Sequence, residues 1–176
     1  MALGSLTSPC GPRRSTLFYS PVWTADVRET ELVLGRRWIL VLEPGEEVIA
    51  ALDEWCARTG VRAGTVDLFF GAFRSVTLIA GRDDTVDPEL PLPTSVEVAY
   101  LEGIGSGSIA QKDGSARVHL HVAAGVKSAG GAAYAGHLLS AEVHYTVEVV
   151  VQEVLSPELT LRVDPRAHGI GCLFFE

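Results

Sequence analysis

Long hydrophobic runs are missing from this chain of 176 residues. Its longest apolar-leaning stretch, Val143 to Val154, still carries His144, Glu148, Gln152 and Glu153. A membrane-spanning helix needs roughly 18 or more consecutive apolar residues, and a secretory signal needs a basic region followed by an apolar one. Because neither pattern occurs, we expect no membrane partner and a cytoplasmic location.

Cysteine is too scarce and too scattered to organise the fold. The three cysteines, Cys10, Cys56 and Cys172, are odd in number and far apart. Disulfide-stapled domains and cysteine-rich zinc sites both place their cysteines in pairs at characteristic spacings. The pattern therefore argues against both kinds of site, and Cys56, on the apolar face of a predicted helix, is expected in the core.

Positive charge is in deficit. The sequence has 14 Lys and Arg against 22 Asp and Glu, which gives a formal net charge of −8, whereas nucleic-acid binders concentrate basic residues on one face. The two close basic pairs, Arg13-Arg14 and Arg36-Arg37, do not extend into a patch. A nucleic-acid partner is therefore not expected. Only Lys112 and Lys127 among the basic residues are lysines, a bias typical of a GC-rich bacterial source.

The sequence does contain enough apolar residues for one packed domain. Hydrophobic residues make up 47% and charged residues 20% of the chain, which is ordinary for a globular protein of this length. We expect residues 1–34 to form an N-terminal extension, with a mobile tail over 1–16 followed by an aromatic segment. Residues 35–176 are then the domain itself.

One segment has clear helical periodicity. Between Glu46 and Arg58, apolar residues recur at the spacing of one helix face, which predicts a helix over this range. Gly60 follows as the expected C-terminal cap. The predicted apolar face consists of Val48, Ile49, Leu52, Trp55 and Cys56.

Most of the remaining chain has the composition of strands. The segment from His137 to Val154 is long enough for a helix, but its many β-branched residues favour a strand. The whole pattern predicts an α+β fold, with an antiparallel, in part mixed, sheet and one main helix. The predicted strands are Arg37–Leu42, Gly64–Phe70, Phe73–Ala80, Val96–Gly103, Ile109–Gln111, Arg117–Ala123, His137–Val154, Pro157–Val163 and Cys172–Phe175, with loops over 81–93 and 128–136 and a Gly/Ser stretch over 103–108.

Three histidines are the strongest candidates for a metal site. His119 and His121 lie two residues apart on a predicted strand, so both point to the same face. His137 begins the next predicted strand, and a hairpin would bring it back beside the pair. Three imidazoles on one surface suit zinc and leave a fourth position open for water. The alternative is that the three line a cavity or are merely exposed.

Two further polar groups stand out on the predicted strands. Glu142 and His144 share a face if their strand is regular, and such a pair can do general acid/base work. The alternative is the solvated face of an antiparallel sheet. Asp67 interrupts the otherwise apolar strand Thr65 to Phe70, so it is paired or functional if buried, and otherwise faces solvent or a subunit interface.

Aromatic residues offer a second kind of candidate site. Most of them are expected in the core, but a subset would line an apolar pocket between subunits, with the N-terminal segment as its lid. The residues we consider for substrate binding are Tyr19, Trp23, Trp38, Phe69 and Phe73.

The stretch from Trp38 to about Val154 resembles the plant-and-prokaryote-conserved (PPC) domain family. The matching segments occur in the same order as in the family, and that order carries the resemblance, because each segment alone is weak evidence. They are Leu42-Glu43-Pro44-Gly45-Glu46, Gly64 through Phe73 with Val76-Thr77-Leu78, Leu101-Glu102-Gly103, the Asp113-Gly114 turn, His119-Leu120-His121-Val122 and Gly136-His137-Leu138. The resemblance implies a homotrimer. Plant members join the domain to an AT-hook, whose Arg-Gly-Arg-Pro core is absent here.

Three functions follow from these observations as hypotheses. The first is an enzyme of bacterial secondary metabolism, such as a cyclase that closes a ring in an apolar polyketide-like substrate by a pericyclic reaction, which needs shape and desolvation more than acid/base groups. The second is zinc-dependent chemistry at His119, His121 and His137. The third is a non-enzymatic PPC protein with a DNA-associated or regulatory role.

Overall fold

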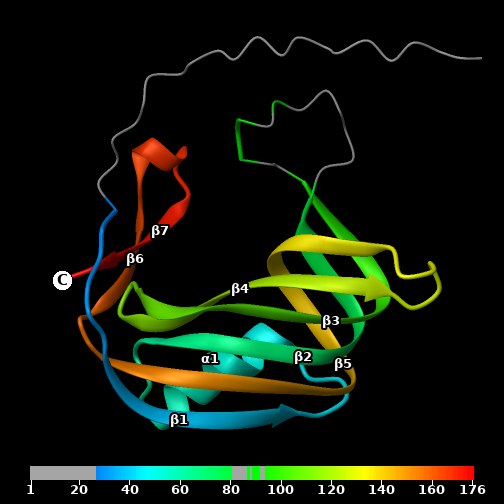
Figure 1. The fold of residues 1–176 in the computed structure, drawn as a ribbon, viewed down its shortest axis with the longest axis horizontal. Helices are drawn as coiled ribbons and strands as arrows, with labels where there is room; N and C mark the ends of the chain where they lie inside the picture. Colours follow the sequence, from blue (N-terminus) through cyan, green and yellow to red (C-terminus); the bar gives the residue numbers. More distant parts are fainter. Residues whose placement is uncertain (1–26, 81–86, 88, 92–93) are drawn as a thin grey trace, which may run out of the picture.

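The computed structural model describes residues 27–80, 87, 89–91 and 94–176, and within these ranges the chain is mostly β (Figure 1). Seven strands form one sheet. A single α-helix accompanies them, so strand content exceeds what the α+β expectation suggested. The elements are β1 (Val33–Leu42), α1 (Val48–Thr59), β2 (Gly64–Ile79), β3 (Ser95–Lys112), β4 (Ser115–Val126), β5 (Ala133–Ser156), β6 (Leu159–Val163), a 3₁₀ turn (Pro165–Ala167) and β7 (Gly171–Phe175).

Four of the strands close into a barrel. β2 pairs with β3, β3 with β4, β4 with β5, and β5 returns to pair with β2, all antiparallel. One edge of the long strand β5 pairs with two strands in succession. Its first residues pair with β4, and its last residues pair with β1. β6 and β7 form a two-stranded ribbon that projects from the barrel (Figure 1).

Helix α1 covers the stretch of β5 between its β4 and β1 partners. The Glu47 carboxylate caps the helix by accepting from the Ala50 N–H, and its other oxygen accepts from the Ala141 N–H of β5. On the other side, Asp53 of the helix accepts from the Val118 N–H of β4. The helix ends at Thr59, and Gly60 caps it in the left-handed conformation, as predicted. It begins at Val48 rather than Glu46, because Glu47 is its N-cap.

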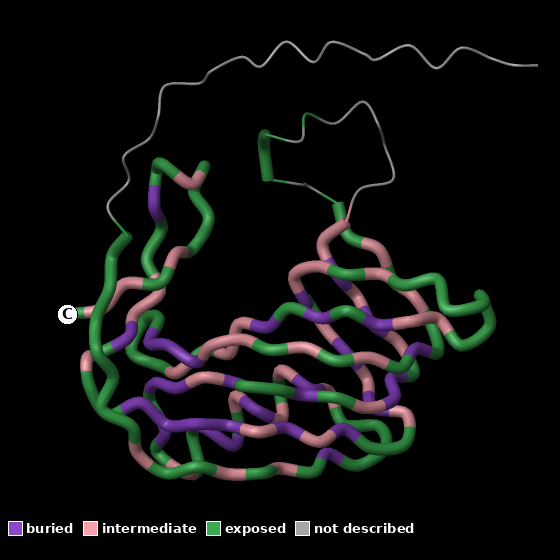
Figure 2. The backbone as a smooth tube through the Cα atoms, in the orientation of Figure 1, coloured by how far each residue is buried: buried purple, intermediate pink, exposed green. Residues whose placement is uncertain are grey.

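The core lies inside the barrel and beneath the helix. Buried positions run along the barrel strands and α1, whereas the residues of β6 and β7 are exposed or half-buried, apart from the buried Leu159 (Figure 2). Cys56 is buried as expected, and burial raises the pKa of its thiol to about 12, which keeps it inert. None of the helices in the described part of the chain has the length and apolar character that a bilayer crossing requires.

Glycines were expected to interrupt the strands, and this expectation was wrong at two places. β2 runs through Gly71 without a break, and β3 runs through the Gly/Ser stretch over 103–108. At Gly71 a β-carbon would lie 2.2 Å from the Thr146 carbonyl oxygen. These glycines therefore allow close approach of neighbouring strands at the tight corners of a barrel, which is a known role of glycine within strands. β5 also begins at Ala133, inside the loop expected over 128–136.

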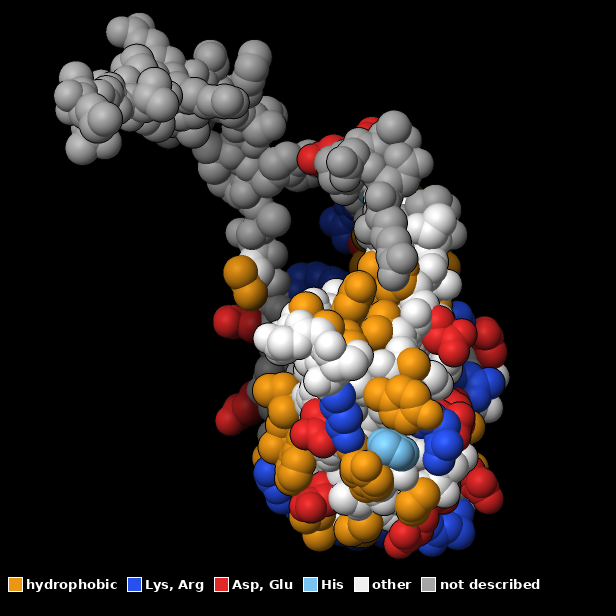
Figure 3. All heavy atoms as spheres, turned by 90° about the vertical axis from the view of Figure 1, so that its right-hand side faces the viewer, with side chains coloured by type: hydrophobic (Ala, Val, Ile, Leu, Met, Phe, Trp, Pro, Cys, Tyr) orange, Lys and Arg blue, Asp and Glu red, His pale blue; other side chains and the backbone are white. Residues whose placement is uncertain are grey.

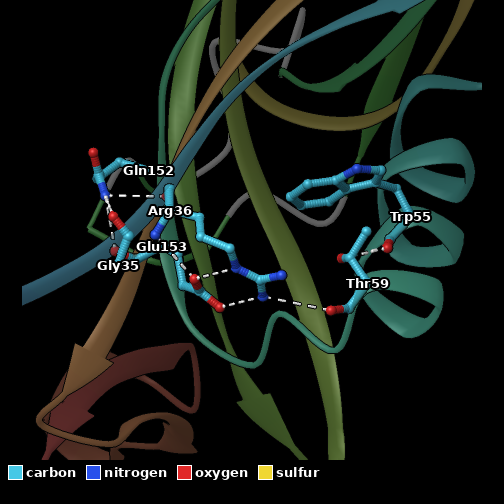
Figure 4. A network of polar contacts seen from close by, with 6 residues as sticks. All are labelled: Gly35, Arg36, Trp55, Thr59, Gln152 and Glu153. Atoms are coloured by element: carbon cyan, nitrogen blue, oxygen red, sulfur yellow. Dashed lines mark hydrogen bonds and ion pairs between the residues drawn. The ribbon is translucent and has the colours of Figure 1, made fainter.

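A polar network ties β1 to β5 where the barrel meets the helix (Figure 4). Arg36 donates through Nε and Nη2 to the two carboxylate oxygens of Glu153, each at 2.9 Å, and its backbone N–H donates to the same group. The Glu153 side chain is only 8% exposed. Beside it, the Gln152 amide donates to the carbonyls of Gly35 and Arg36. The network gives hydrogen-bond partners to buried polar groups, which would otherwise destabilise the folded protein.

We expect the Arg36→Met variant to lose stability at pH 7 and to approach the wild type as the pH falls. The hydrogen bonds from Arg36 lower the pKa of Glu153, although burial opposes them. A carboxyl whose folded pKa is depressed stabilises the protein above its unfolded pKa, near 4.3, and loses that contribution as the pH falls through the folded pKa. Melting temperatures measured between pH 3 and pH 7 test this.

The matched control is Arg162→Met, because Arg162 pairs with Glu176 where both side chains are largely exposed. Its melting temperature should follow the wild type at every pH. Equal decreases in melting temperature for the two variants at pH 7 would show that the burial of Glu153 does not explain the loss of stability.

Candidate metal centre

The three histidines predicted as metal ligands lie together on the outer face of the sheet. His121 of β4 is directly opposite His137 of β5 in the strand register, so both side chains project from the same face. His119, two residues before His121, shares that face because successive side chains of a strand alternate. The hairpin between β4 and β5 thus brings three imidazoles together.

The rings are close enough to act as one site. Each histidine offers a ring nitrogen, and the three nitrogens lie within 4.8 Å of one another. The Nε2 of His119 and the Nδ1 of His137 are 3.0 Å apart. His119 and His137 are half-buried, whereas His121 is exposed, so the cluster is open on one side. The open side leaves room for a further ligand.

The surroundings favour neutral imidazoles. Partial burial is the main cause that lowers the pKa of His119, and the neighbouring His137 and His121 lower it further. Burial likewise lowers the pKa of His137, with a smaller effect from His121. Metal ions bind the neutral form of histidine, so these shifts prepare the site for a metal at neutral pH.

The donor set fits a tetrahedral zinc ion. With Zn–N bonds of about 2.0–2.1 Å, tetrahedral geometry separates two nitrogen ligands by about 3.3 Å. The 3.0 Å contact between His119 and His137 is slightly short of this value, whereas the outer limit of 4.8 Å for the cluster exceeds it by about 1.5 Å. The rings must therefore move toward one another when a metal binds. Three imidazoles and no thiolate suit zinc among the common metals.

Small polar side chains extend from the histidines across the sheet. On β3, Ser106 is directly opposite His121 and Ser108 is opposite His119. Thr65 of β2 is in turn opposite Ser108. Directly opposed residues share a face, so these hydroxyls lie on the same outer surface as the imidazoles. No motif predicts this arrangement, because single serines and threonines in strands carry no recognisable pattern.

Exposed apolar side chains lie on the same outer face. Ile104 of β3 is opposite Phe70 of β2, and both are more than a third exposed. Leu68 of β2 and Ile39 of β1 are each opposite Val150 of β5. The histidines therefore stand at one side of a sheet surface that is polar in its middle and apolar around it.

The predicted acid/base pair is arranged differently from the histidines. Glu142 pairs with Arg74, Oε1 to Nε at 2.9 Å. His144 stacks on Tyr145 with ring centroids 3.9 Å apart, and its buried Nδ1 has no partner among the described residues. The register between β2 and β5 is irregular next to these residues, and no hydrogen bond joins Glu142 to His144 in the described chain. Their catalytic role stays a prediction.

The aromatic candidates for substrate binding are scattered. Phe69 and Phe73 are completely buried, with ring centroids 6.4 Å apart, so contact with a substrate would require the core to open. Trp38 is half-buried and packs edge-on against Trp55 of the helix. Tyr19 and Trp23 lie outside the described residues. A substrate role for the five stays a prediction.

The sequence of this chain was compared with those of known proteins. A family model described as the Plants and Prokaryotes Conserved (PCC) domain matches residues 30–155. No match is found among curated proteins.

Solved structures share the fold at low sequence identity. A PPC protein from Pyrococcus horikoshii is 20% identical, with a TM-score of 0.70 over 85% of this chain and 97% of that one. A metal-containing protein from Archaeoglobus fulgidus is 24% identical, with a TM-score of 0.68 over 84% and 99%. A candidate DNA-binding protein from Bacteroides thetaiotaomicron is 23% identical, with a TM-score of 0.67 over 82% and 97%. At these identities the likeness concerns the fold alone.

Proposed function

This chain belongs to the Plants and Prokaryotes Conserved (PCC) domain family, and we propose that it is a metal-dependent enzyme that acts on a small molecule. The proposal is based on the chain's own residues, because a fold alone does not determine an activity. His119, His121 and His137 would hold one zinc ion per chain. The observation that carries this proposal is the set of three ring nitrogens within 4.8 Å of one another on an accessible face. The metal-containing protein from Archaeoglobus fulgidus, which has the same fold, agrees with it.

The chain's own groups define what such a site would do. Zinc held by three histidines supplies an open position at which it polarises an oxygen of the substrate or acidifies a bound water. His119 and His137, whose pKa values are lowered, stay neutral and keep their ring nitrogens free for the metal. The hydroxyls of Ser106 and Ser108, across from the histidines, are in place to bind polar atoms of the substrate.

We also propose that the protein is a homotrimer with this site near a subunit interface. Exposed apolar side chains on the outer sheet face support self-association, since patches of this kind usually mark interaction surfaces. They include Ile39, Val41, Leu68, Phe70 and Ile104.

The DNA-associated alternative has less support. Most arginines of the described chain are paired with carboxylates, as in Arg36–Glu153, Arg37–Asp67 and Arg74–Glu142. On the face drawn in Figure 3, side chains of both charge signs alternate with hydrophobic ones and form no basic patch. With a net charge of −8, such a surface has little attraction for phosphates.

The cyclase hypothesis stands as the less supported enzyme. It depends on an aromatic pocket, and Phe69 and Phe73, two of its five candidate residues, are completely buried. The metal hypothesis depends instead on groups that are already accessible.

A native mass spectrum of the purified protein, combined with metal analysis, tests the proposal. We expect a trimer with one zinc per chain. Replacement of zinc by cobalt(II) should give the intense visible absorption of a four-coordinate site, and that absorption should change when a small metal-binding molecule such as acetohydroxamate displaces water. A protein that binds no stoichiometric metal after zinc or cobalt loading would refute the proposed function, whatever its oligomeric state.

A further inference from the structure

The polar part of the outer face ends in an ion pair opposite the histidines. Asp67 lies where β2 bulges, between the partners of Gly107 and Gly105, so that two residues of β2 face Ser106 of β3. Bulges re-aim side chains and are common beside active sites. The next strand after Ser106 carries His121. One strand, β3, therefore separates the bulge from the histidines.

The bulge fixes an arginine over the middle of the sheet. Arg37 projects from β1, and its Nη2 lies 2.8 Å from the Oδ2 of Asp67. Thr65 holds the other oxygen of Asp67 by a hydrogen bond. The guanidinium is therefore placed above β2 although Arg37 belongs to a strand two positions away. Its side chain is 59% exposed, and a guanidinium has five N–H donors.

This arrangement is suited to a carboxylate. The remaining N–H groups of an oriented guanidinium bind carboxylates in a bidentate manner. A divalent metal held by the three histidines, together with Arg37 and Asp67, gives the strip a net positive charge in a protein whose net charge is −8. Neighbouring strands are about 4.8 Å apart, so β2 and β4 are separated by about 10 Å. A metal bond and a hydrogen bond together take about 5 Å of this distance.

We propose that Arg37, held by Asp67, determines specificity by binding a carboxylate of the substrate. This inference rests on the proposed metal site. The substrate is then a small carboxylic acid with a second oxygen-bearing group about 5 Å from the carboxylate, and that second group is the one that binds the metal. Ser106 lies between the two ends. Leu68 and Ile104 border the strip with apolar side chains.

Two hydroxamate probes that differ at one end distinguish this model from a metal site without the arginine contact. Succinate monohydroxamate and butanehydroxamate both bind metals through the hydroxamate, and they differ by a carboxylate in place of a methyl group. Titration of each into the cobalt(II)-loaded protein, followed by visible absorption, gives both affinities. We expect succinate monohydroxamate to bind about tenfold or more tightly, since a hydrogen-bonded charge contributes about 1.5–3 kcal/mol.

Variants assign the preference to Arg37. Arg37→Met should bind the two probes equally and keep its affinity for butanehydroxamate, and Arg37→Lys, which retains the charge without the fork, should keep only part of the preference. Arg162→Met removes an exposed arginine from the distant ribbon, where Arg162 pairs with Glu176, and should behave like the wild type. An unchanged response to butanehydroxamate also proves that each variant is folded.

The outcomes separate this inference from the proposed function. Absence of a cobalt spectrum would refute the metal site itself. A normal cobalt spectrum with equal wild-type affinities for the two probes would refute the role of Arg37 and leave the metal site standing. A normal spectrum with no response to either probe would mean that another copy of the chain covers this face, which also overturns the inference.

Discussion

Replacing His121 by alanine should lower the zinc affinity of this protein by more than about 100-fold. Loss of a residue that only orients a metal ligand by a hydrogen bond already reduces metal affinity by about 10–100-fold. His121 would be a ligand itself, so its loss should have a larger effect. The side chain is exposed, so its removal leaves no cavity and the melting temperature of the metal-free protein should stay unchanged. Competition with a chromogenic chelator measures the affinity, and circular dichroism measures the melting.

His168→Asn is the matched control for this variant. His168 is also exposed, but it lies in the turn before β7, far from the cluster in sequence and in the sheet. Asparagine is suitable because His168 has a positive φ of 53°, which asparagine tolerates better than alanine. Equal zinc affinities in both variants and the wild type would show that the cluster is not a metal site.

Replacing Gly105 by valine should destabilise the fold by about 3 kcal/mol or more, because overpacking a core forces backbone and side chains to shift. A β-carbon at this position would lie 2.2 Å from the His121 carbonyl oxygen and 2.3 Å from the ring of Phe69. Phe69 is completely buried and has no free volume into which to move. Guanidinium unfolding followed by circular dichroism measures the change, against a total of about 5–15 kcal/mol for an ordinary domain.

Gly125→Ala tests whether the effect comes from crowding rather than from glycine in a strand. Gly125 lies on β4, and the nearest atom to a β-carbon there is the Glu102 carbonyl oxygen at 3.9 Å. Alanine in a strand is favoured over glycine by about 0.5–1 kcal/mol, so this variant should be as stable as the wild type or slightly more stable. A similar loss in both variants would contradict the crowding explanation.

The sequence predicts the helix and the histidine cluster because both depend on local spacing. One apolar face and a capping glycine define α1. The two-residue interval between His119 and His121 and the return of the chain at His137 define the cluster. Neither argument needs knowledge of distant contacts. The family resemblance, confirmed by the match over residues 30–155, then limits the fold.

Other features depend on partners that the sequence does not identify. Glycines at 71 and 105 suggest breaks when read locally, yet they lie inside continuous strands because a neighbouring backbone or ring occupies the place of a side chain. Asp67 and Arg37 meet only because β1 and β2 both flank β5. The irregular register around Glu142 and His144 also arises from pairing between β2 and β5, and no alternation pattern reveals it.

The position of β5 also constrains the order of events during synthesis. β1, β2 and β4 all pair with this one strand, and β5, which spans Ala133–Ser156, follows all three in the sequence. As the chain emerges from the ribosome at about 5–20 residues per second, β1 to β4 are made before the strand that joins them. The barrel closes only when β5 has been translated, and until then the edges of the earlier strands that pair with β5 are unpaired, a condition that favours misassociation.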